Sequence, residues 1–218
     1  MRGVNLAAKT LLVGLLLYAV LRPDLPQFQG KAMEARLVVF GAPALLLPLS
    51  WALTRRWRGP RAYPHGTDLC IVLPFLMDTA GNALDLYDTV AWFDDLLHFA
   101  TWVPWVVAFG LLLHYAPRLP RWAHFAVVLG FGAVTHVLWE LGEYVTFVRN
   151  SPELATAYTD TLGDLALSLT GSVAGALLSA TALWSAGRRH AQHGERAPDA
   201  GAPPSHGLRV DATTAAGR

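Results

Sequence analysis

Six side chains that can bind protons or metal ions lie near the ends of three long apolar segments. They are Asp94, His98, Glu140, Glu143, Asp160 and Asp164. Ionisable groups at membrane depth are costly unless they are paired or hydrated, and they mark functional sites in membrane proteins. Their recurrence on three segments is therefore the strongest indication of function in this sequence.

The spacing of these residues is typical of metal sites in helical bundles. Residues three or four apart lie on the same side of a helix, as in Asp94-x3-His98, Glu140-x2-Glu143 and Asp160-x3-Asp164. Helical bundles build metal sites from such pairs on facing helices. A set rich in oxygen atoms with one imidazole suits Mg, Mn, Fe or Zn and does not select among them. The sequence thus predicts a divalent-metal site whose ion is not specified.

Three further residues could form a proton or cation relay. Asp78 and Asp85, with Asn82 between them, are expected on one face of another segment, and His136 precedes Glu140 by one helical turn. We expect Asp78 near the middle of the membrane, where its carboxyl group must be protonated or paired. His136 is a candidate partner.

Structural explanations compete with the metal site at two of the three pairs. Thr161-x2-Asp164 matches a helix-capping pattern, and Asp94 favours the positive N-terminal end of a helix. Glu140 and Glu143 are expected near the C-terminal end of their helix, where negative charge is unfavourable. We therefore interpret this last pair as functional.

Composition identifies the class of protein that must hold these groups. Of 218 residues, 53% are hydrophobic and 15% are charged, too few for an ordinary soluble fold. The basic residues are confined to loops, which argues against binding of nucleic acid. The single cysteine, Cys70, excludes an internal disulfide. The composition predicts an all-α, polytopic transmembrane helical bundle in contact with the lipid bilayer.

A helix needs about 20 apolar residues to cross the hydrocarbon core. About six stretches meet this length: residues 4–21, 37–53, 68–86, 96–116, 122–144 and 162–185. The third is the weakest, because it contains Asp78 and Asp85. We expect a transmembrane domain over residues 1–186 and a disordered cytoplasmic tail over 187–218, where Arg, His, Ala, Gly and Pro replace the apolar residues.

Positive charge predicts the orientation of the bundle in the membrane. Arginines occupy alternate connections: Arg2, then Arg55, Arg56, Arg58 and Arg61, then Arg118 and Arg121, then Arg188 and Arg189. Basic loops stay in the cytoplasm, so we expect both termini there. Counting about 1.5 Å per residue places His98, Glu140 and Asp164 roughly 27 to 33 Å from the cytoplasmic ends of their helices. The three residues are therefore expected in one outer layer.

The sixth stretch also predicts which way its acidic residues face. Asp160, Asp164, Ser168, Gly171 and Gly175 share one side of the helix. Small residues permit close packing of helices in a bilayer. We therefore expect this side to face the interior of the bundle.

Three blocks in order resemble the YjdF-like family of bacterial inner-membrane proteins. The blocks are Phe93-Asp94-Asp95-Leu96-Leu97-His98, then Trp139-Glu140-Leu141-Gly142-Glu143-Tyr144, then Asp160-Thr161-Leu162-Gly163-Asp164 followed by Gly171. The resemblance covers roughly residues 88–178. It implies a location in the bacterial inner (plasma) membrane, and it implies no activity, because the family is functionally uncharacterised.

Three hypotheses of function follow from the sequence. The first is a metal site that activates water for hydrolytic or transfer chemistry on a lipid or other membrane-borne substrate. For it we favour His98, Glu140, Glu143 and Asp164 as ligands, with Asp94 and Asp160 as further or supporting ligands. The second is a proton- or cation-coupled transporter that uses Asp78, His136 and Glu140. The third is a non-catalytic scaffold whose polar residues only join helices.

Overall fold

The protein is built from helices. The structure, a computed structural model, describes residues 1–58, 62–113, 119–146 and 148–195. Six long helices occur in these residues: α1 (Arg2–Leu21), α2 (Met33–Arg58), α3 (His65–Ala83), α5 (Phe93–Leu113), α6 (Arg121–Thr146) and α7 (Ala157–Glu195). The short helix α4 (Leu86–Thr89) and the 3₁₀ turns Pro26–Phe28, Val148–Asn150 and Pro152–Ala155 lie between them. No strand occurs among the described residues, which confirms the all-α prediction.

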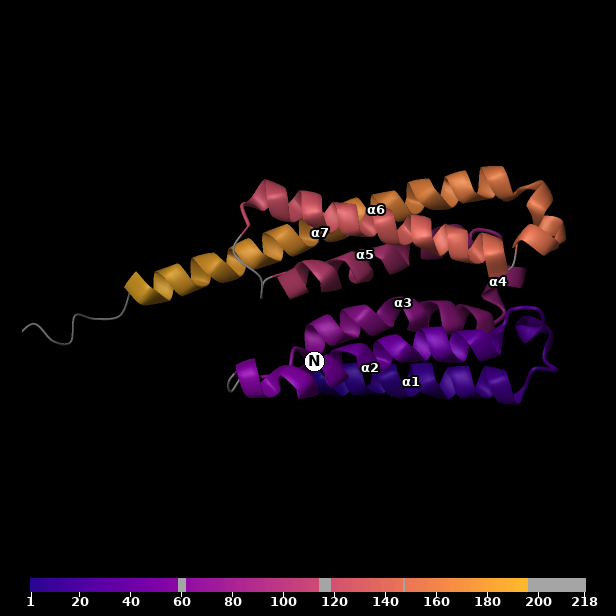
Figure 1. The fold of residues 1–218 in the computed structure, drawn as a ribbon, viewed down its shortest axis with the longest axis horizontal. Helices are drawn as coiled ribbons and strands as arrows, with labels where there is room; N and C mark the ends of the chain where they lie inside the picture. The colour runs from indigo at the N-terminus through magenta and orange to yellow at the C-terminus, as the bar shows by residue number, and fades with distance from the viewer. Residues whose placement is uncertain (59–61, 114–118, 147, 196–218) are drawn as a thin grey trace, which may run out of the picture. The chain divides into compact units, whose positions relative to one another are not determined.

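Five of the long helices are long and apolar enough to cross a membrane: α1, α2, α5, α6 and α7. The third predicted span, α3, is not among them, because acidic and other polar residues interrupt its apolar run. It nevertheless packs against α1, α2 and α5, and successive long helices run in opposite directions (Figure 1). The prediction of a membrane helical bundle is confirmed, whereas the side on which each terminus lies stays a prediction.

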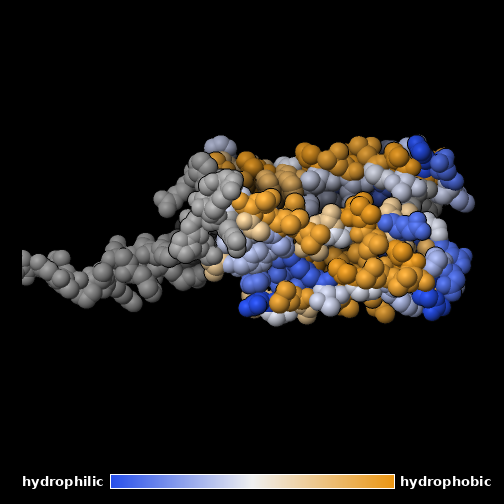
Figure 2. Space-filling model, turned by 60° about the horizontal axis from the view of Figure 1, so that its bottom comes forward, coloured by the Kyte–Doolittle hydropathy of each residue, from blue (hydrophilic) through white to orange (hydrophobic). Residues whose placement is uncertain are grey.

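The outer surfaces of the helices are apolar. On α2, the exposed side chains include Val38, Val39, Leu45, Leu46, Leu49 and Leu53. Figure 2 shows hydrophobic residues over much of one face, with hydrophilic residues at its right-hand end and at its lower left. Exposed apolar surface on this scale is unfavourable in water and favourable against lipid. The bundle therefore contacts the lipid bilayer through these surfaces.

The first three helices share one apolar core. Leu12 and Leu16 of α1 pack with Phe40 and Ala44 of α2 and with Val72 of α3. All five side chains are buried. This core holds α3, and hence its acidic residues, against α1 and α2.

The last helices pack closely through glycine and serine. A Cβ atom on Gly175 of α7 would lie 2.7 Å from the carbonyl oxygen of Val103 on α5, and one on Gly171 would collide with the carbonyl oxygen of Phe99. The prediction that the small-residue side of α7 faces the bundle interior is confirmed. This close approach brings the polar residues near the start of α7 to those near the start of α5.

The chain divides into two units, Met1–Leu183 and Trp184–Arg218. Helix α7 continues to Glu195, through residues 187–195 of the predicted tail. The rest of that tail, with Arg61 and Arg118 of the predicted basic loops, lies outside the described residues. The domain boundary near Ala186 therefore stays a prediction.

Candidate metal centre

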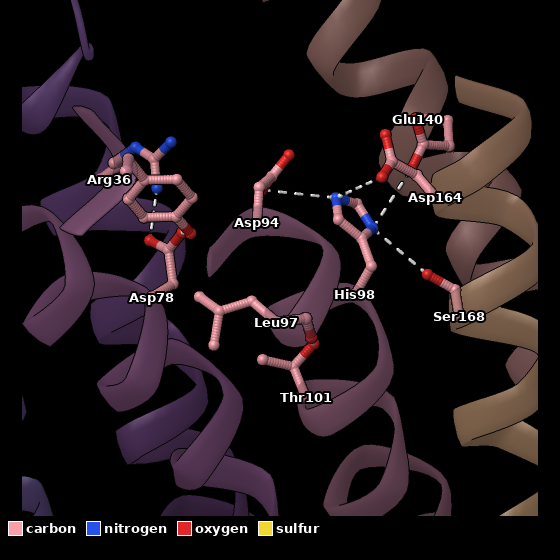
Figure 3. Close-up of polar contacts among 10 residues, drawn as sticks. Arg36, Asp78, Asp94, Leu97, His98, Thr101, Glu140, Asp164 and Ser168 are labelled. Carbon is pink, nitrogen blue, oxygen red and sulfur yellow. Dashed lines mark hydrogen bonds and ion pairs between the residues drawn. The ribbon is translucent and has the colours of Figure 1, made fainter. Parts of the chain in front are cut away.

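His98 is the centre of the polar cluster and lies in the second turn of α5. Its side chain is 7% exposed. The Nδ1 atom lies 3.2 Å from the Oγ atom of Ser168 on α7, within hydrogen-bonding distance (Figure 3). Because Ser168 comes from a different helix, this contact fixes the orientation of the imidazole ring within the bundle.

Three carboxyl groups surround this imidazole at nearly equal distances. The Nε2 atom lies 3.7 Å from Oδ1 of Asp94 and 3.6 Å from Oδ1 of Asp164. The Nδ1 atom lies 3.6 Å from Oε1 of Glu140. These distances exceed that of a normal hydrogen bond. Two ligands of one tetrahedral ion, each about 2.1 Å from it, lie about 3.4 Å apart, so the spacing suits ligands that share an ion.

The predicted ligands form two groups that share His98. One consists of Asp94, His98 and Asp164, and the other of His98, Glu140 and Glu143. Within each group, one ligand atom per residue lies within 4.8 Å of the others. The structure thus brings together five of the six predicted ligands, from three helices.

Asp160 is the exception. It lies one helical turn before Asp164, and its side chain is exposed rather than part of either group. The difference arises because α7 starts only at Ala157. Asp160 therefore lies in the first turn of the helix, outside the packed region.

The helix bounds also test the helix-end explanations of three site residues. Because α7 begins at Ala157, Thr161 lies inside the helix and cannot cap it, so the capping explanation of Asp164 is wrong. Glu143 lies in the last turn of α6, where the helix dipole disfavours a carboxylate. Asp94 lies in the first turn of α5, where the dipole favours it, so that explanation still applies to Asp94.

Two polar atoms in this region are buried without a hydrogen-bond partner. They are Oε1 of Glu140, which faces His98, and Nδ1 of His136, one turn earlier on α6. Glu140 is 9% exposed. Unsatisfied buried polar atoms are rare in proteins and often indicate an unseen water or ion.

The expected relay residues do not come together. Asp78 forms an ion pair with Arg36 of α2, and the hydroxyl group of Tyr87 donates a hydrogen bond of 2.5 Å to Asp78 Oδ1. His136 instead packs edge-on against Trp102. The expectation that Asp78 pairs with His136 is therefore wrong, because the nearby cation comes from α2.

Asp85 also lies apart from the face on which it was expected. Helix α3 ends at Ala83, and Asp85 precedes α4 with a left-handed backbone, φ 60°. Asp85 therefore cannot share a helical face with Asp78. The helix ends before the predicted end of the third span.

The sequence analysis missed a second polar cluster between α1 and α3. Asp68 is fully buried, and its Oδ2 atom accepts hydrogen bonds of 2.7 Å from Asn5 and from Tyr63. The Nζ atom of Lys9 lies 2.6 Å from the same oxygen. Lys9 is an ionisable residue inside the first apolar stretch. A search for every ionisable residue at membrane depth, basic as well as acidic, could therefore have found it.

A cavity of about 140 Å³ adjoins the polar cluster. Asp94, His98 and Glu143 contribute to its wall, as do Asp78 and Tyr87. The remaining wall is mainly apolar and aromatic, formed by Phe40, Pro74, Phe75, Leu97, Thr101, Trp102, Trp105, Thr135 and Trp139. The cluster therefore borders an internal space large enough for a small apolar group.

Fold and site together define a helical membrane protein with a buried cluster of carboxyl and imidazole groups. Residues 4–185 match the sequence profile of a family described as predicted membrane protein (DUF2238), and the chain belongs to this family. The match contains the whole segment that resembles YjdF-like proteins. No curated protein and no solved structure matches the chain.

Proposed function

We propose that this protein is a multi-pass protein of the bacterial inner membrane that binds a divalent metal ion in the outer half of the bilayer. Its termini lie in the cytoplasm, and the ion serves chemistry on a lipid or another membrane-borne substrate. The observation that carries the proposal is the convergence of His98, Asp94 and Asp164 from α5 and α7, with Glu140 and Glu143 of α6 on the other side of the imidazole.

The ligands of the ion are Asp94, the Nε2 atom of His98, and Asp164. Ser168 lies within hydrogen-bonding distance of Nδ1, so Nε2 is the nitrogen left to bind a metal. A metal-bound histidine commonly donates its other N–H group to a neighbouring acceptor, which fixes the ring. Ser168 and Glu140 are the acceptors of that N–H group here, and they act as positioning residues.

The negative charge of the cluster also supports the binding of a divalent cation. The two buried carboxyl groups beside His98, those of Asp164 and Glu140, carry more negative charge when ionised than one imidazole can balance. Asp164 and Glu140 are 6% and 9% exposed, so water cannot fully stabilise this charge. A divalent cation would balance it, since buried carboxylates are stable only when paired or bound to metal.

The cluster is open on one side, so a substrate can reach it. Asp94 is 49% exposed, whereas the other two ligands are buried, so the site is open on the side of Asp94. A divalent ion held there would supply Lewis-acid activation of water or of a polar substrate group. Glu143 lies in the cavity wall beside His98, where it can accept a proton from a bound reactant.

Elemental analysis of the purified protein tests the proposal. We expect stoichiometric metal in the wild-type protein and none after His98→Ala or Asp164→Asn. Asp160→Asn is the matched control, because it removes a carboxylate from the same helix outside the site. Glu140→Gln should retain the ion with about 10- to 100-fold weaker affinity. Folded wild-type protein that binds no divalent metal would refute the proposal.

The same variants address the other two hypotheses. The transporter relay loses support because Asp78 pairs with Arg36, whereas His136 packs against Trp102. Uptake of protons into proteoliposomes that Asp78→Asn abolishes would restore it. A scaffold predicts that Glu140→Gln lowers thermal stability and leaves the metal content unchanged.

A further inference from the structure

The wall of the cavity beside His98 changes from polar to apolar along the axes of α5 and α6. On α5 its wall extends from Asp94 to Trp105, and on α6 from Glu143 to Thr135. At about 1.5 Å per residue these are lengths of roughly 16 Å and 12 Å. The acidic residues lie at one end of each stretch, and tryptophan and threonine lie at the other. The cavity is therefore polar at the cluster and apolar away from it.

Three polar side chains of the inner wall are already hydrogen-bonded within the protein. The hydroxyl groups of Thr101 and Thr135 donate to the carbonyl oxygens of Leu97 and Phe131. The indole N–H of Trp105 donates to Thr135 at 3.3 Å. Because these groups are satisfied, this end of the cavity offers a ligand mainly hydrocarbon and aromatic surface.

The size of the cavity limits what it can hold. Its volume is about 140 Å³, and an apolar cavity of about 150 Å³ holds one benzene molecule. The space thus fits a segment of about six carbon atoms rather than a whole lipid. A segment adjoining a polar group at His98 would be the part of an apolar chain nearest to its head group.

We propose that the protein binds a membrane lipid, with the first part of the lipid's apolar chain against the wall formed by Phe40, Phe75, Trp102 and Trp139 and its polar head at Asp94, His98 and Glu143. This inference rests on the proposed function, since it assigns the substrate class of the same site. A water-soluble substrate would gain nothing from the aromatic wall. Helices α2, α5 and α6, which form much of the cavity wall, are candidate membrane spans, so a lipid is the apolar molecule present at that depth.

Photolabelling in nanodiscs tests the inference. The probe is a lysophospholipid with a photoreactive diazirine in its acyl chain, close to the head group. We expect saturable labelling of Trp102, Trp105 or Trp139, mapped by mass spectrometry and displaced by the unlabelled lysophospholipid. Labelling that does not saturate, or that falls only on lipid-facing residues such as Val134, would overturn the inference.

A pair of variants separates binding in the cavity from contact with bulk lipid. Thr101→Phe fills the cavity and should reduce the saturable labelling by about tenfold, a change of about 1.4 kcal/mol in binding. Val134→Phe places the same ring on the exposed side of α6, where the residue is 60% exposed, and should leave the labelling unchanged. Equal effects of the two variants would contradict the inference. If Thr101→Phe does not fold, the mapping on the wild-type protein decides.

The metal content of the same samples distinguishes this inference from the proposed function. Stoichiometric metal without saturable labelling would overturn the lipid substrate alone. Saturable labelling of the cavity in protein that binds no metal would refute the proposed function and leave a lipid-binding cavity.

Discussion

The two buried polar clusters of this protein differ in how their charges are balanced. Asp68, between α1 and α3, has Lys9 at 2.6 Å and accepts hydrogen bonds from Asn5 and Tyr63. His98, between α5 and α7, has three carboxyl groups at 3.6 to 3.7 Å, beyond hydrogen-bonding distance. The first cluster contains its own cation at contact distance, whereas the imidazole of the second lies beyond hydrogen-bonding distance of its three carboxyl groups.

This difference suggests different roles for the two clusters. An ion pair with additional hydrogen bonds has its charge balanced without a ligand and joins two helices, and this holds for Asp68 although its Oδ1 atom and that of Asn5 are buried without a hydrogen-bond partner. Carboxyl groups gathered around an imidazole at the spacing of shared metal ligands are the cluster to which the proposed function assigns a cation. Burial of ionisable groups alone therefore does not identify a site, and the pattern of their partners is needed to distinguish the two.

The largest expected effect is at the Asp68 cluster. Asp68→Ala leaves the mostly buried Lys9, 15% exposed, with only the carbonyl oxygen of Ala44 as a partner and should lower the free energy of unfolding by about 3 to 5 kcal/mol. The double change Lys9→Met with Asp68→Leu should recover much of that loss. Thermal unfolding in detergent measures both. A single change at Asp68 that has no effect on stability would show that the pair is not structural.

A smaller effect is expected at the His98 cluster when metal is added. A divalent ion at about 100 times its dissociation constant should stabilise the wild-type protein by about 2.7 kcal/mol. Asp164→Asn should abolish this response, and the double variant at Lys9 and Asp68 should keep it. If the double variant at Lys9 and Asp68 also loses its stabilisation by metal, the contrast between the two clusters is wrong.

The packing that positions the His98 cluster should tolerate little added volume. Gly171→Ala places a methyl group against the carbonyl oxygen of Phe99 and should cost about 1 to 3 kcal/mol. Gly163→Ala, on the same helix with no atom within 4 Å of the new Cβ, should instead stabilise the helix by about 0.5 to 1 kcal/mol. Unfolding curves that show the same sign for both variants would contradict the close packing of α5 and α7.

The smallest effect is expected at the exposed pair of Lys31 and Asp88, whose atoms lie 2.6 Å apart. The hydrogen bond from Lys31 holds the pKa of Asp88 below its ordinary value. Its contribution is therefore present at neutral pH and lost as the pH falls through that lowered pKa. Because Asp88 is exposed, the contribution should be below about 1 kcal/mol.

Lys31→Ala tests this contribution. The variant should reduce stability at neutral pH by that small amount and have no effect once Asp88 is protonated. Thermal unfolding of both proteins from neutral pH to about pH 3 measures the difference. A difference that grows as the pH falls would contradict the assigned sign.

The sequence predicted features that depend on one helix at a time. Apolar length located five of the six long helices among the described residues, and spacing identified the inward side of α7 with Gly171 and Gly175. The position of Glu140 and Glu143 at an unfavourable helix end also pointed to the cluster that the structure forms. Each of these predictions needs only the apolar length, the residue spacing or the end charge of a single helix.

Features that depend on how two helices meet could not be predicted in this way. The partner of Asp78 is Arg36, which depends on the rotation and depth of α2 against α3. Helix ends caused the other errors: α7 begins before Thr161, and α3 ends before Asp85. A few residues at a helix end decide whether a polar side chain caps the helix, lies in a turn or enters the bundle.

X-ray absorption spectroscopy of the protein loaded with Co²⁺ tests the central claim most directly. We expect an ion bound by oxygen atoms and one imidazole nitrogen, with the imidazole signal lost in His98→Ala and unchanged in the double variant at Lys9 and Asp68. A Co²⁺ ion with only oxygen ligands, and a spectrum that His98→Ala does not alter, would contradict the metal centre.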